Sequence, residues 1–214
     1  MKEISTLTSV GIDTIYPRLL DHLVASCASY DVNIQSWKTL PPNARTHSES
    51  PYGFKVYAIR EAIASGYQII VWADSAVFLV ADPTPFFELV VEKGIVVLGQ
   101  GDRLDKWVND KSIKEFGAVR EKLKDYWLLS GTVFGFDVRN PAALSFLDEL
   151  ERYEKGDWYC EDGQENDSVY KQHRHDEAIM SLLVYRHGIE VQNAYDYMNG
   201  GTDGVVFRTS KELR

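Results

Sequence analysis

The chain has 214 residues, of which 44% are apolar and 26% charged, a composition typical of a globular protein with one sizeable core. We therefore expect a single domain over residues 1–214. The formal net charge of -9 argues against a general nucleic-acid or membrane-surface binder, because such proteins gather Lys and Arg to meet phosphates.

Strand and helix patterns alternate along the chain. Apolar runs bounded by turn residues predict strands over residues 4–10, 32–37, 67–74, 95–100, 128–138 and 189–194. Apolar residues at helical spacing, with Pro near some starts and Gly at most ends, predict helices over residues 16–29, 54–65, 83–94, 141–156 and 174–188. The polar stretch 41–53 predicts a long loop, and such loops often serve ligands. The alternation predicts an α/β fold with a mostly parallel central sheet and helices on both faces.

The two cysteines and the hydropathy pattern indicate the compartment. Cys27 and Cys160 have no partner at the spacing of a zinc or redox motif, which favours a reducing environment. No stretch reaches the roughly 18 apolar residues of a membrane span. We expect a cytoplasmic protein without membrane insertion, and the sequence leaves open whether the chain is complete or a domain of a longer one.

One carboxylate stands out because it ends a strand that is expected to be buried. Asp74 follows the apolar run that begins at Ile69, and Ser75 comes next. An ionised Asp is costly to bury alone, and ligands of open α/β sheets sit at the carboxyl ends of the strands. Asp74 is therefore a candidate site residue; the alternative is that it caps the turn after the strand.

The stretch VWADSAVFLVADPTPFF, residues 71–87, resembles a motif of nucleotide-diphospho-sugar transferases with the GT-A glycosyltransferase fold. In that family a strand runs into Asp-x-Asp, a few apolar residues, Asp-Pro and a helix. Asp74 matches the first acid and Asp82-Pro83 the later pair, whereas Ala76 stands where the second acid, usually the direct metal ligand, would be. The resemblance extends to the glycosyltransferase domains of large algal (chlorella) viruses.

Further segments resemble the family in the expected order. FKVYAIREAIASGYQIIVWAD is similar to the helix and strand before the acidic motif, which places Lys55 and Arg60 in the helix that faces the nucleotide. LLSGTVFGFDV resembles a strand in which Ser130 and Gly131 would let the donor sugar approach the backbone. A solvated helix face is the alternative explanation for the two basic residues.

A dense polar cluster precedes the last predicted helix. RHDEAIMSLL resembles the family's late Asp-Gln helix, with Asp176 and Glu177 in its place. Arg174, or one of the histidines His173 and His175 beside it, would pair with phosphate or sugar. A carboxylate here would accept the proton of the acceptor hydroxyl, and Asp176 is preferred. Capping of the helix is the alternative role for both acids. A zinc site from His173 and His175 is disfavoured, since alternate residues in a loop do not form the i,i+4 pair that metals use on helices.

The resemblance implies transfer of a hexose or deoxyhexose, of the glucose or rhamnose type, from a UDP-sugar to a carbohydrate acceptor. Mn²⁺ or Mg²⁺ would stabilise the departing pyrophosphate, with Asp74 as protein ligand and Ser75 beside it. Thr6 and Thr8 lie in the first strand, at the place where the family holds the nucleoside, although Thr is also ordinary in strands.

Two other functions are compatible with parts of the pattern. Ala76 in place of an acid raises the alternative of a nucleotide-sugar-binding module that has lost catalysis. A nucleotidyltransferase on a similar sheet is disfavoured, because no Gly-rich loop with Lys or Arg follows the first strand. Among the aromatic residues, most are expected in the core, and the pair Trp158-Tyr159 in a polar segment is the preferred acceptor contact.

Overall fold

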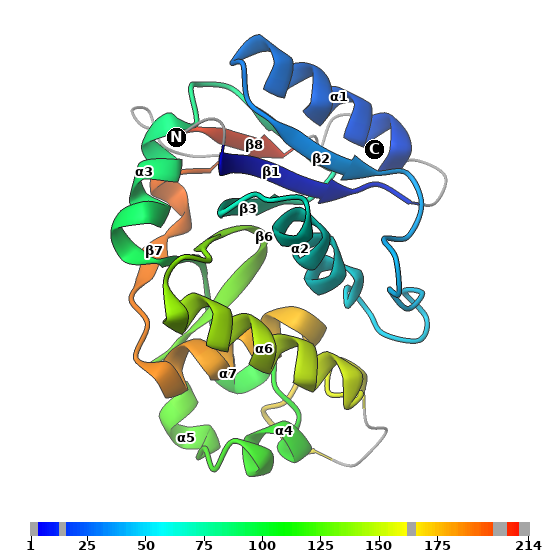
Figure 1. Ribbon diagram of the computed structural model, residues 1–214. Helices are drawn as coiled ribbons and strands as arrows, with labels where there is room; N and C mark the ends of the chain where they lie inside the picture. Colours follow the sequence, from blue (N-terminus) through cyan, green and yellow to red (C-terminus); the bar gives the residue numbers. More distant parts are fainter. Residues whose placement is uncertain (1–3, 13–15, 162–165, 199–204, 210–214) are drawn as a thin grey trace.

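A central sheet lies between two layers of helices in the computed structural model, which describes residues 4–12, 16–161, 166–198 and 205–209 (Figure 1). Within these residues the sheet has six strands in the order β2-β1-β3-β6-β5-β7. The strands are β1 Ser5–Val10, β2 Ile34–Trp37, β3 Ile69–Ala73, β5 Ile95–Arg103, β6 Trp127–Asp137 and β7 Val191–Asn193. The helices are α1 Tyr16–Ser29, α2 Phe54–Ala64, α3 Thr84–Lys93, α4 Asp110–Glu115, α5 Arg120–Leu123, α6 Pro141–Lys155 and α7 His175–His187, with 3-10 turns η2 Leu104–Lys106 and η3 Ala194–Asp196.

The strand directions confirm the expected, mostly parallel sheet. β1 lies between β2 and β3 and runs parallel to both, so that Leu7 faces Ile34 on one side and Val71 on the other. β7 runs parallel to β5, whereas β6 runs antiparallel to β3 and β5. The sequence does not reveal this reversal, because a strand buried on both faces has the same apolar pattern in either direction.

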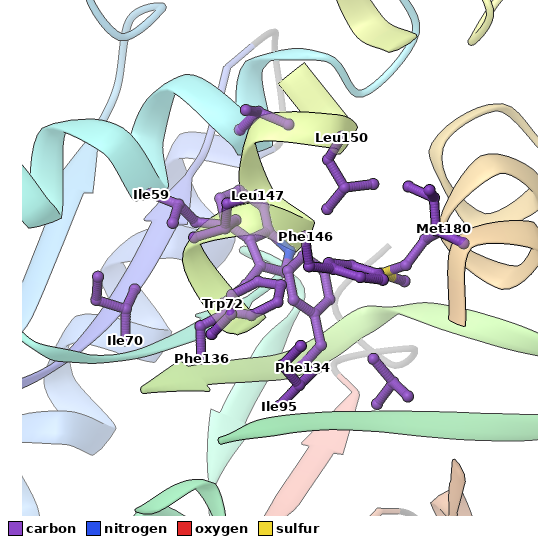
Figure 2. Close-up of a cluster of buried hydrophobic side chains, with 14 of the residues drawn as sticks. Ile59, Ile70, Trp72, Ile95, Phe134, Phe136, Phe146, Leu147, Leu150 and Met180 are labelled. Carbon is purple, nitrogen blue, oxygen red and sulfur yellow. The ribbon is translucent and has the colours of Figure 1, made fainter. Parts of the chain in front are cut away.

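Each face of the sheet carries its own helices and its own core. On one face α2, α6 and α7 pack on a buried cluster that includes Trp72, Phe134 and Phe146 (Figure 2). On the other face Leu23 of α1 and Val90 of α3 belong to a second cluster. The expected α/β class with helices on both faces is thus confirmed, and the carboxyl ends of the parallel strands meet at one edge.

Smaller elements complete the described chain. β4 (Val77–Leu79) pairs antiparallel with β8 (Phe207–Thr209), a short ribbon that the sequence pattern did not predict because each strand has only three residues. Residues 41–53 form the predicted loop. In the described residues, no helix combines the length and the apolar composition that a membrane span requires.

The contact between α3 and β6 gives a stability prediction. A methyl group at Gly135 would lie 2.4 Å from Val90 Cγ2 and 3.3 Å from Val71 Cγ2. We expect Gly135→Ala to lower the free energy of unfolding by about 1–3 kcal/mol, measured by urea denaturation, because the packed layers cannot accept the extra carbon. In a Val90→Ala background the same change should cost less, and an equal cost in both backgrounds would contradict this packing argument.

Candidate active site

Asp74 lies directly after β3, at the carboxyl edge of the sheet. Its backbone N–H donates to Thr132 O of β6 at 2.9 Å, and the turn that follows is closed by Val77 N donating to Asp74 O at 2.9 Å. Its carboxylate instead accepts from Trp72 Nε1 at 2.8 Å. The backbone therefore closes this turn, and the side chain of Asp74 takes part in a separate polar centre.

Lys55 is the centre of that polar group. Its Nζ lies 2.8 Å from Asp176 Oδ2 and 3.5 Å from Asp74 Oδ1, and it donates to Gly131 O at 2.8 Å. Only 4% of Lys55 is exposed, so this Lys does not belong to a solvated helix face. The first turn of α2, the end of β3, the middle of β6 and the start of α7 therefore meet at one ammonium group.

Gly131 is required by this close approach. A Cβ at that position would lie 2.9 Å from Lys55 Nζ, 3.0 Å from Asp176 Oδ2 and 3.0 Å from Glu177 Cγ. A side chain would thus push apart the charged groups that Gly131 brings together. The small-residue pair seen in the sequence serves the packing of charged side chains against β6.

Burial and charge shift the pKa values of the three partners. Burial raises the pKa of Asp176 to about 6, with the opposing pull of Lys55 and the added repulsion of Glu177. Burial likewise raises the pKa of Asp74, against the attraction of Lys55. Burial alone would lower the pKa of Lys55, but the charges of Asp176 and Asp74 outweigh it and raise this pKa above its ordinary value. Lys55 is thus held as a cation between two carboxylates.

Glu177, the next residue of α7, has partners of its own. Its Oε1 accepts from Gly131 N at 2.9 Å, and its Oε2 accepts from Arg174 Nε at 3.0 Å and from Gln100 Nε2 at 3.3 Å. The N-cap of α7 is Arg174, which makes no capping bond through its side chain. Asp176 and Glu177 therefore bind Lys55 and β6, which goes beyond the capping role that their sequence position allowed.

Two adjoining cavities open at this centre, and Tyr52 and Asp74 line both. The first, of about 300 Å³, has an aromatic and apolar wall and is lined by Val10, Ile12, Tyr16, His47, Tyr52, Phe54, Trp72, Asp74, Ser75 and Ala76. The second, of about 230 Å³, is strongly polar and is lined by Tyr52, Lys55, Asp74, Thr132, Gln172, Arg174, His175, Asp176 and Glu177. The pair combines a chamber of mixed aromatic and polar lining with a strongly charged one.

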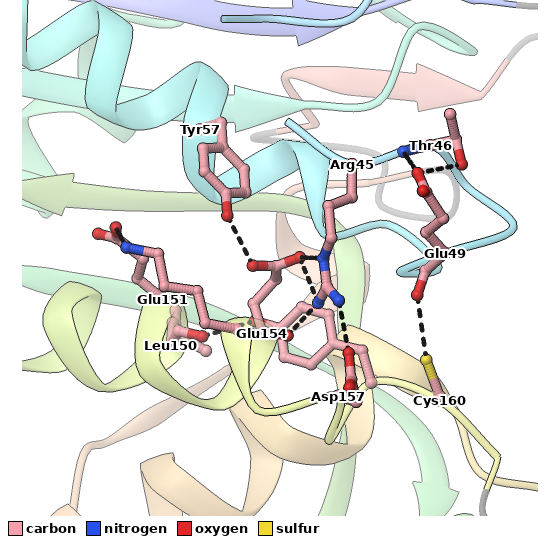
Figure 3. Close-up of polar contacts among 11 residues, drawn as sticks. Arg45, Thr46, Glu49, Tyr57, Leu150, Glu151, Glu154, Asp157 and Cys160 are labelled. Atoms are coloured by element: carbon pink, nitrogen blue, oxygen red, sulfur yellow. Dashed lines mark hydrogen bonds and ion pairs between the residues drawn. The ribbon is translucent and has the colours of Figure 1, made fainter. Parts of the chain in front are cut away.

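The loop before α2 is fixed to α6 by a buried ion pair (Figure 3). Arg45 lies 2.8 Å from Glu154 Oε1 and 2.5 Å from Asp157 Oδ1, and Tyr57 donates to Glu154 Oε2 at 2.8 Å. The side chain of Glu154 has no exposed surface. Because His47 and Tyr52 of the same loop line the first cavity, Arg45 and Glu154 hold one wall of the candidate site in place.

The two histidines before α7 have different environments. The ring of His173 is fully buried; its Nδ1 accepts from Asn109 N at 3.4 Å and its Nε2 lies 2.9 Å from Trp158 O. His175 has a left-handed backbone, with φ 49°, and its Nδ1 lies 2.7 Å from Tyr159 O. Within the described residues no group of three His, Cys, Asp or Glu side chains is arranged to hold a metal ion.

The structure brings Lys55, Asp74, Asp176, Glu177 and Gly131 together, and it places Ser75 and Arg174 on the cavity walls. Other predicted residues lie elsewhere. His175, one of the two histidines considered as an alternative to Arg174, lines the second cavity. Tyr52, His47, Tyr16 and Gln172 line the cavities but were not predicted from the sequence. The long polar loop 41–53 was the available signal for the first two.

Arg60 does not line either cavity. Its Nε donates to Glu151 at 2.8 Å and its guanidinium lies 2.5 Å from Asp148, both on α6. Thr6 and Thr8 are fully buried within β1, and Thr6 Oγ1 donates to Leu7 O at 2.8 Å. The end of β1 reaches the first cavity through Val10 instead.

Ser130 and the Trp158-Tyr159 pair also lie outside the cavity walls. Ser130 is buried in β6, and its Oγ accepts from Thr132 N at 3.3 Å. Tyr159 is 1% exposed and belongs to the core, and Trp158 packs edge-on against Tyr153 at 6.1 Å between ring centroids. The expected acceptor contact through Tyr159 is wrong, because its ring fills the core beneath the polar segment, part of which, 162–165, lies outside the described residues.

No protein-family model matches the sequence, and a search of curated proteins finds no match. Among solved structures, the chain is similar to the crystal structure of a glycosyltransferase involved in the glycosylation of the major capsid of PBCV-1, with a TM-score of 0.58 and 13% sequence identity. The match covers 97% of this chain and 92% of that chain. At this identity the likeness establishes a shared fold.

The ion-pair centre predicts a pH-dependent cost for loss of the ammonium. Lys55→Met leaves Asp74 and Asp176 without their counter-charge, so we expect the free energy of unfolding at pH 7 to fall by about 3–5 kcal/mol. A carboxylate whose pKa is raised in the folded state destabilises the fold only once it ionises, so the loss should shrink toward pH 5. Lys93→Met, which removes a surface ammonium beside Glu92 and Glu190, is the matched control and should leave the free energy of unfolding nearly unchanged at every pH, because solvent screens exposed ion pairs. Urea denaturation at several pH values measures both losses. Equal, pH-independent losses for Lys55→Met and Lys93→Met would contradict the role of Lys55 as counter-charge to Asp74 and Asp176.

The fixed loop predicts a coupled effect on stability and binding. We expect Arg45→Met to lower the free energy of unfolding by about 3–5 kcal/mol, because Glu154 stays buried without its cation. The sequence resemblance implies a UDP-sugar donor, so we also expect weaker binding of UDP in titration calorimetry, because the wall that carries His47 and Tyr52 loses its anchor.

Arg60→Met is the control for this prediction, since Arg60 also pairs with carboxylates of α6 but lies outside both cavities. It should leave UDP affinity unchanged. If Arg60→Met weakened UDP binding as much as Arg45→Met does, Arg60 would also contribute to the ligand site, contrary to its position outside both cavities.

Proposed function

We propose that this protein is a GT-A glycosyltransferase that moves a hexose or deoxyhexose, of the glucose or rhamnose type, from a UDP-sugar to a carbohydrate acceptor. The observation that carries the proposal is the centre of Lys55, Asp74 and Asp176 at the carboxyl edge of the sheet, beside one cavity with aromatic and polar walls and a second, charged cavity. The fold shared with a glycosyltransferase over nearly the whole chain supports it.

The two cavities suit the two halves of a nucleotide sugar. The first offers the aromatic rings of Tyr16 and Tyr52 to a base and ribose, and Asp74 and Ser75 offer oxygens to the hydroxyl groups. The second offers Lys55 and Arg174 to the diphosphate and its sugar. The boundary between the cavities, at Asp74, is where the two halves of the donor would join.

The proposed reaction exchanges one bond at the anomeric carbon for another. The acceptor hydroxyl oxygen bonds to that carbon and gives its proton to a carboxylate, while the bond to the β-phosphate oxygen breaks and its electron pair leaves on UDP. Asp176 is the preferred proton acceptor, because burial raises its pKa to about 6, close to neutral pH, and Glu177 lies next to it. Lys55 and Arg174 would stabilise the charge on the departing diphosphate.

A divalent cation is compatible with these residues as a site of few protein ligands. Asp74 accepts from Trp72 through Oδ1, and Ala76 lines the same cavity with a methyl group. Mg²⁺ in such sites is held by one or two carboxylates together with substrate phosphates and waters. Asp74 would therefore hold Mn²⁺ or Mg²⁺, and the ion would supply charge stabilisation for the departing diphosphate when bound.

The viral origin that we propose for this chain, with activity in the cytoplasm of the host cell, rests on the sequence resemblance to the glycosyltransferase domains of large algal viruses. The alternative function is a nucleotide-sugar-binding module without catalysis, which Ala76 in the place of the second acid favours. Binding of a UDP-sugar without release of UDP would support that module.

The donor reaction tests the assignment through Asp74. We expect Asp74→Asn to lower release of UDP from UDP-sugars by at least about 10²-fold, while the near-isosteric amide keeps the bond from Trp72 and the fold. Asp82→Asn is the matched control, since Asp82 accepts from Thr84 N in the first turn of α3 and lines neither cavity of the site. Undiminished turnover in a folded Asp74→Asn protein would overturn the role of Asp74.

A second variant tests the metal. Ala76→Asp should tighten Mn²⁺ binding in calorimetry, because it places a second carboxylate on the wall of the cavity that Asp74 lines. Equal or weaker Mn²⁺ affinity in this variant would contradict the metal role of Asp74.

A further inference from the structure

A group of exposed aromatic side chains lies at the start of β6. Tyr126 and Trp127 are 37% and 40% exposed, which is high for residues of their size. The rings of Tyr126 and Tyr185 stack with centroids 4.0 Å apart, and the guanidinium carbon of Arg103 lies 4.6 Å from the centroid of the Trp127 ring. We call these four residues the aromatic platform.

A ladder of hydrogen bonds ties the platform to the candidate active site. Glu177, Ser181 and Tyr185 lie at i, i+4 and i+8 on α7 and so share one face of the helix. The carboxylate of Glu177 accepts from Gly131 N at 2.9 Å, Ser181 Oγ from Leu129 N at 3.0 Å, and Tyr185 OH from Trp127 N at 2.8 Å. One end of this ladder is the acidic centre of the site, and the other end is the platform.

The platform also lies on the side of the sheet where the site opens. β3 ends at Ala73, which pairs with Val133 of β6, whereas β6 reaches back to Trp127 and pairs there with Arg103 of β5. The β5–β6 pair thus continues beyond the carboxyl end of β3. The four steps along β6 from Trp127 to Gly131 span about 13 Å at the usual rise of a strand, further than one sugar ring reaches.

The chemistry of the platform suits a carbohydrate chain. A sugar ring has an apolar C–H face that packs on aromatic rings, and hydroxyl groups that bond to guanidinium and phenol groups. β5 adds no bulk here: Cβ atoms at Gly99 and Gly101 would lie 3.3 Å from Trp127 Cβ and 3.6 Å from Trp127 Cζ3. Next to the platform along the chain, Gly101, Lys124 and Asp125 are exposed, unlike the apolar centre of a protein interface.

We propose that the aromatic platform binds the acceptor glycan at a sugar unit beyond the one that receives the transferred sugar. This inference rests on the proposed function for the identity of the occupant. It assigns acceptor length selection to the start of β6, and donor recognition to the two cavities at Asp74.

The test uses the full chain with saturating UDP on an array of immobilised hexose oligosaccharides of one to six units. We expect the wild type to bind chains of three or more units more tightly than single sugars, and Trp127→Ala and Tyr126→Ala each to lose about tenfold on the longer chains only. Tyr195→Ala, which removes a ring that is 62% exposed on η3, is the matched control and should bind as the wild type does. Calorimetry with UDP should give equal affinities for all four proteins.

Several results would overturn the proposal. The first is that both platform variants bind glycans as tightly as the wild type, and the second is that the wild type binds no glycan. The third is that the variants only lose a dimer in sedimentation, because the platform would then be a contact between two copies of the chain. Release of UDP from UDP-sugars separates the two proposals. If the wild type releases UDP while the platform variants bind glycans normally, only the platform fails, whereas absence of UDP-sugar binding and UDP release defeats the proposed function itself.

Discussion

The buried ammonium of Lys55 is the interaction on which the candidate site depends. Asp74 and Asp176 come from a strand end and a helix start that are far apart in the sequence, and each would be costly to bury alone. Lys55 compensates both charges at once and also donates a hydrogen bond to the carbonyl oxygen of Gly131. Such a buried arrangement stabilises the fold only while all partners are present, since removal of one leaves uncompensated charge. The same group therefore fixes the geometry of the site and limits which residues can change.

A second buried carboxylate, Glu154, has a comparable role for the loop before α2. Arg45 reaches it from the loop, and Tyr57 reaches it from α2. The loop thus has a fixed wall-forming position although it contains no helix or strand. Tyr52, at φ 62°, adopts a left-handed backbone at the end of this loop, beside both cavities. Backbone strain of this kind persists where the surroundings hold it, as Arg45 and Glu154 do here.

The sequence predicted the architecture better than the site. Apolar periodicity located the strands and long helices, and the interruption at Asp74 located the end of β3 where a carboxylate meets Lys55, because both are local patterns. The environment of Lys55 and Arg60 was not predictable, since both occupy plausible positions on α2 and only the packing of α7 and α6 decides which one is buried. The prediction for Tyr159 failed for a related reason, since polar neighbours in the sequence do not show whether an aromatic ring points to solvent or into the core. His175 joined the cavity wall through a left-handed backbone that a non-glycine residue rarely adopts.

The reversed direction of β6 has an evolutionary consequence. Because β6 is antiparallel to β3 and β5, its first residue lies at the edge of the sheet where the parallel strands end. The segment 104–126, with η2, α4 and α5, precedes β6 and therefore lies at that edge. Leu104, Ile113 and Leu123 of this segment share a small core with Ala178 and Leu182 of α7, separate from the two cores of the sheet. Because this small core is separate from the cores of the sheet, one side of the candidate site can change in sequence while the residues around Lys55 stay the same. Related chains would be expected to diverge first in this segment.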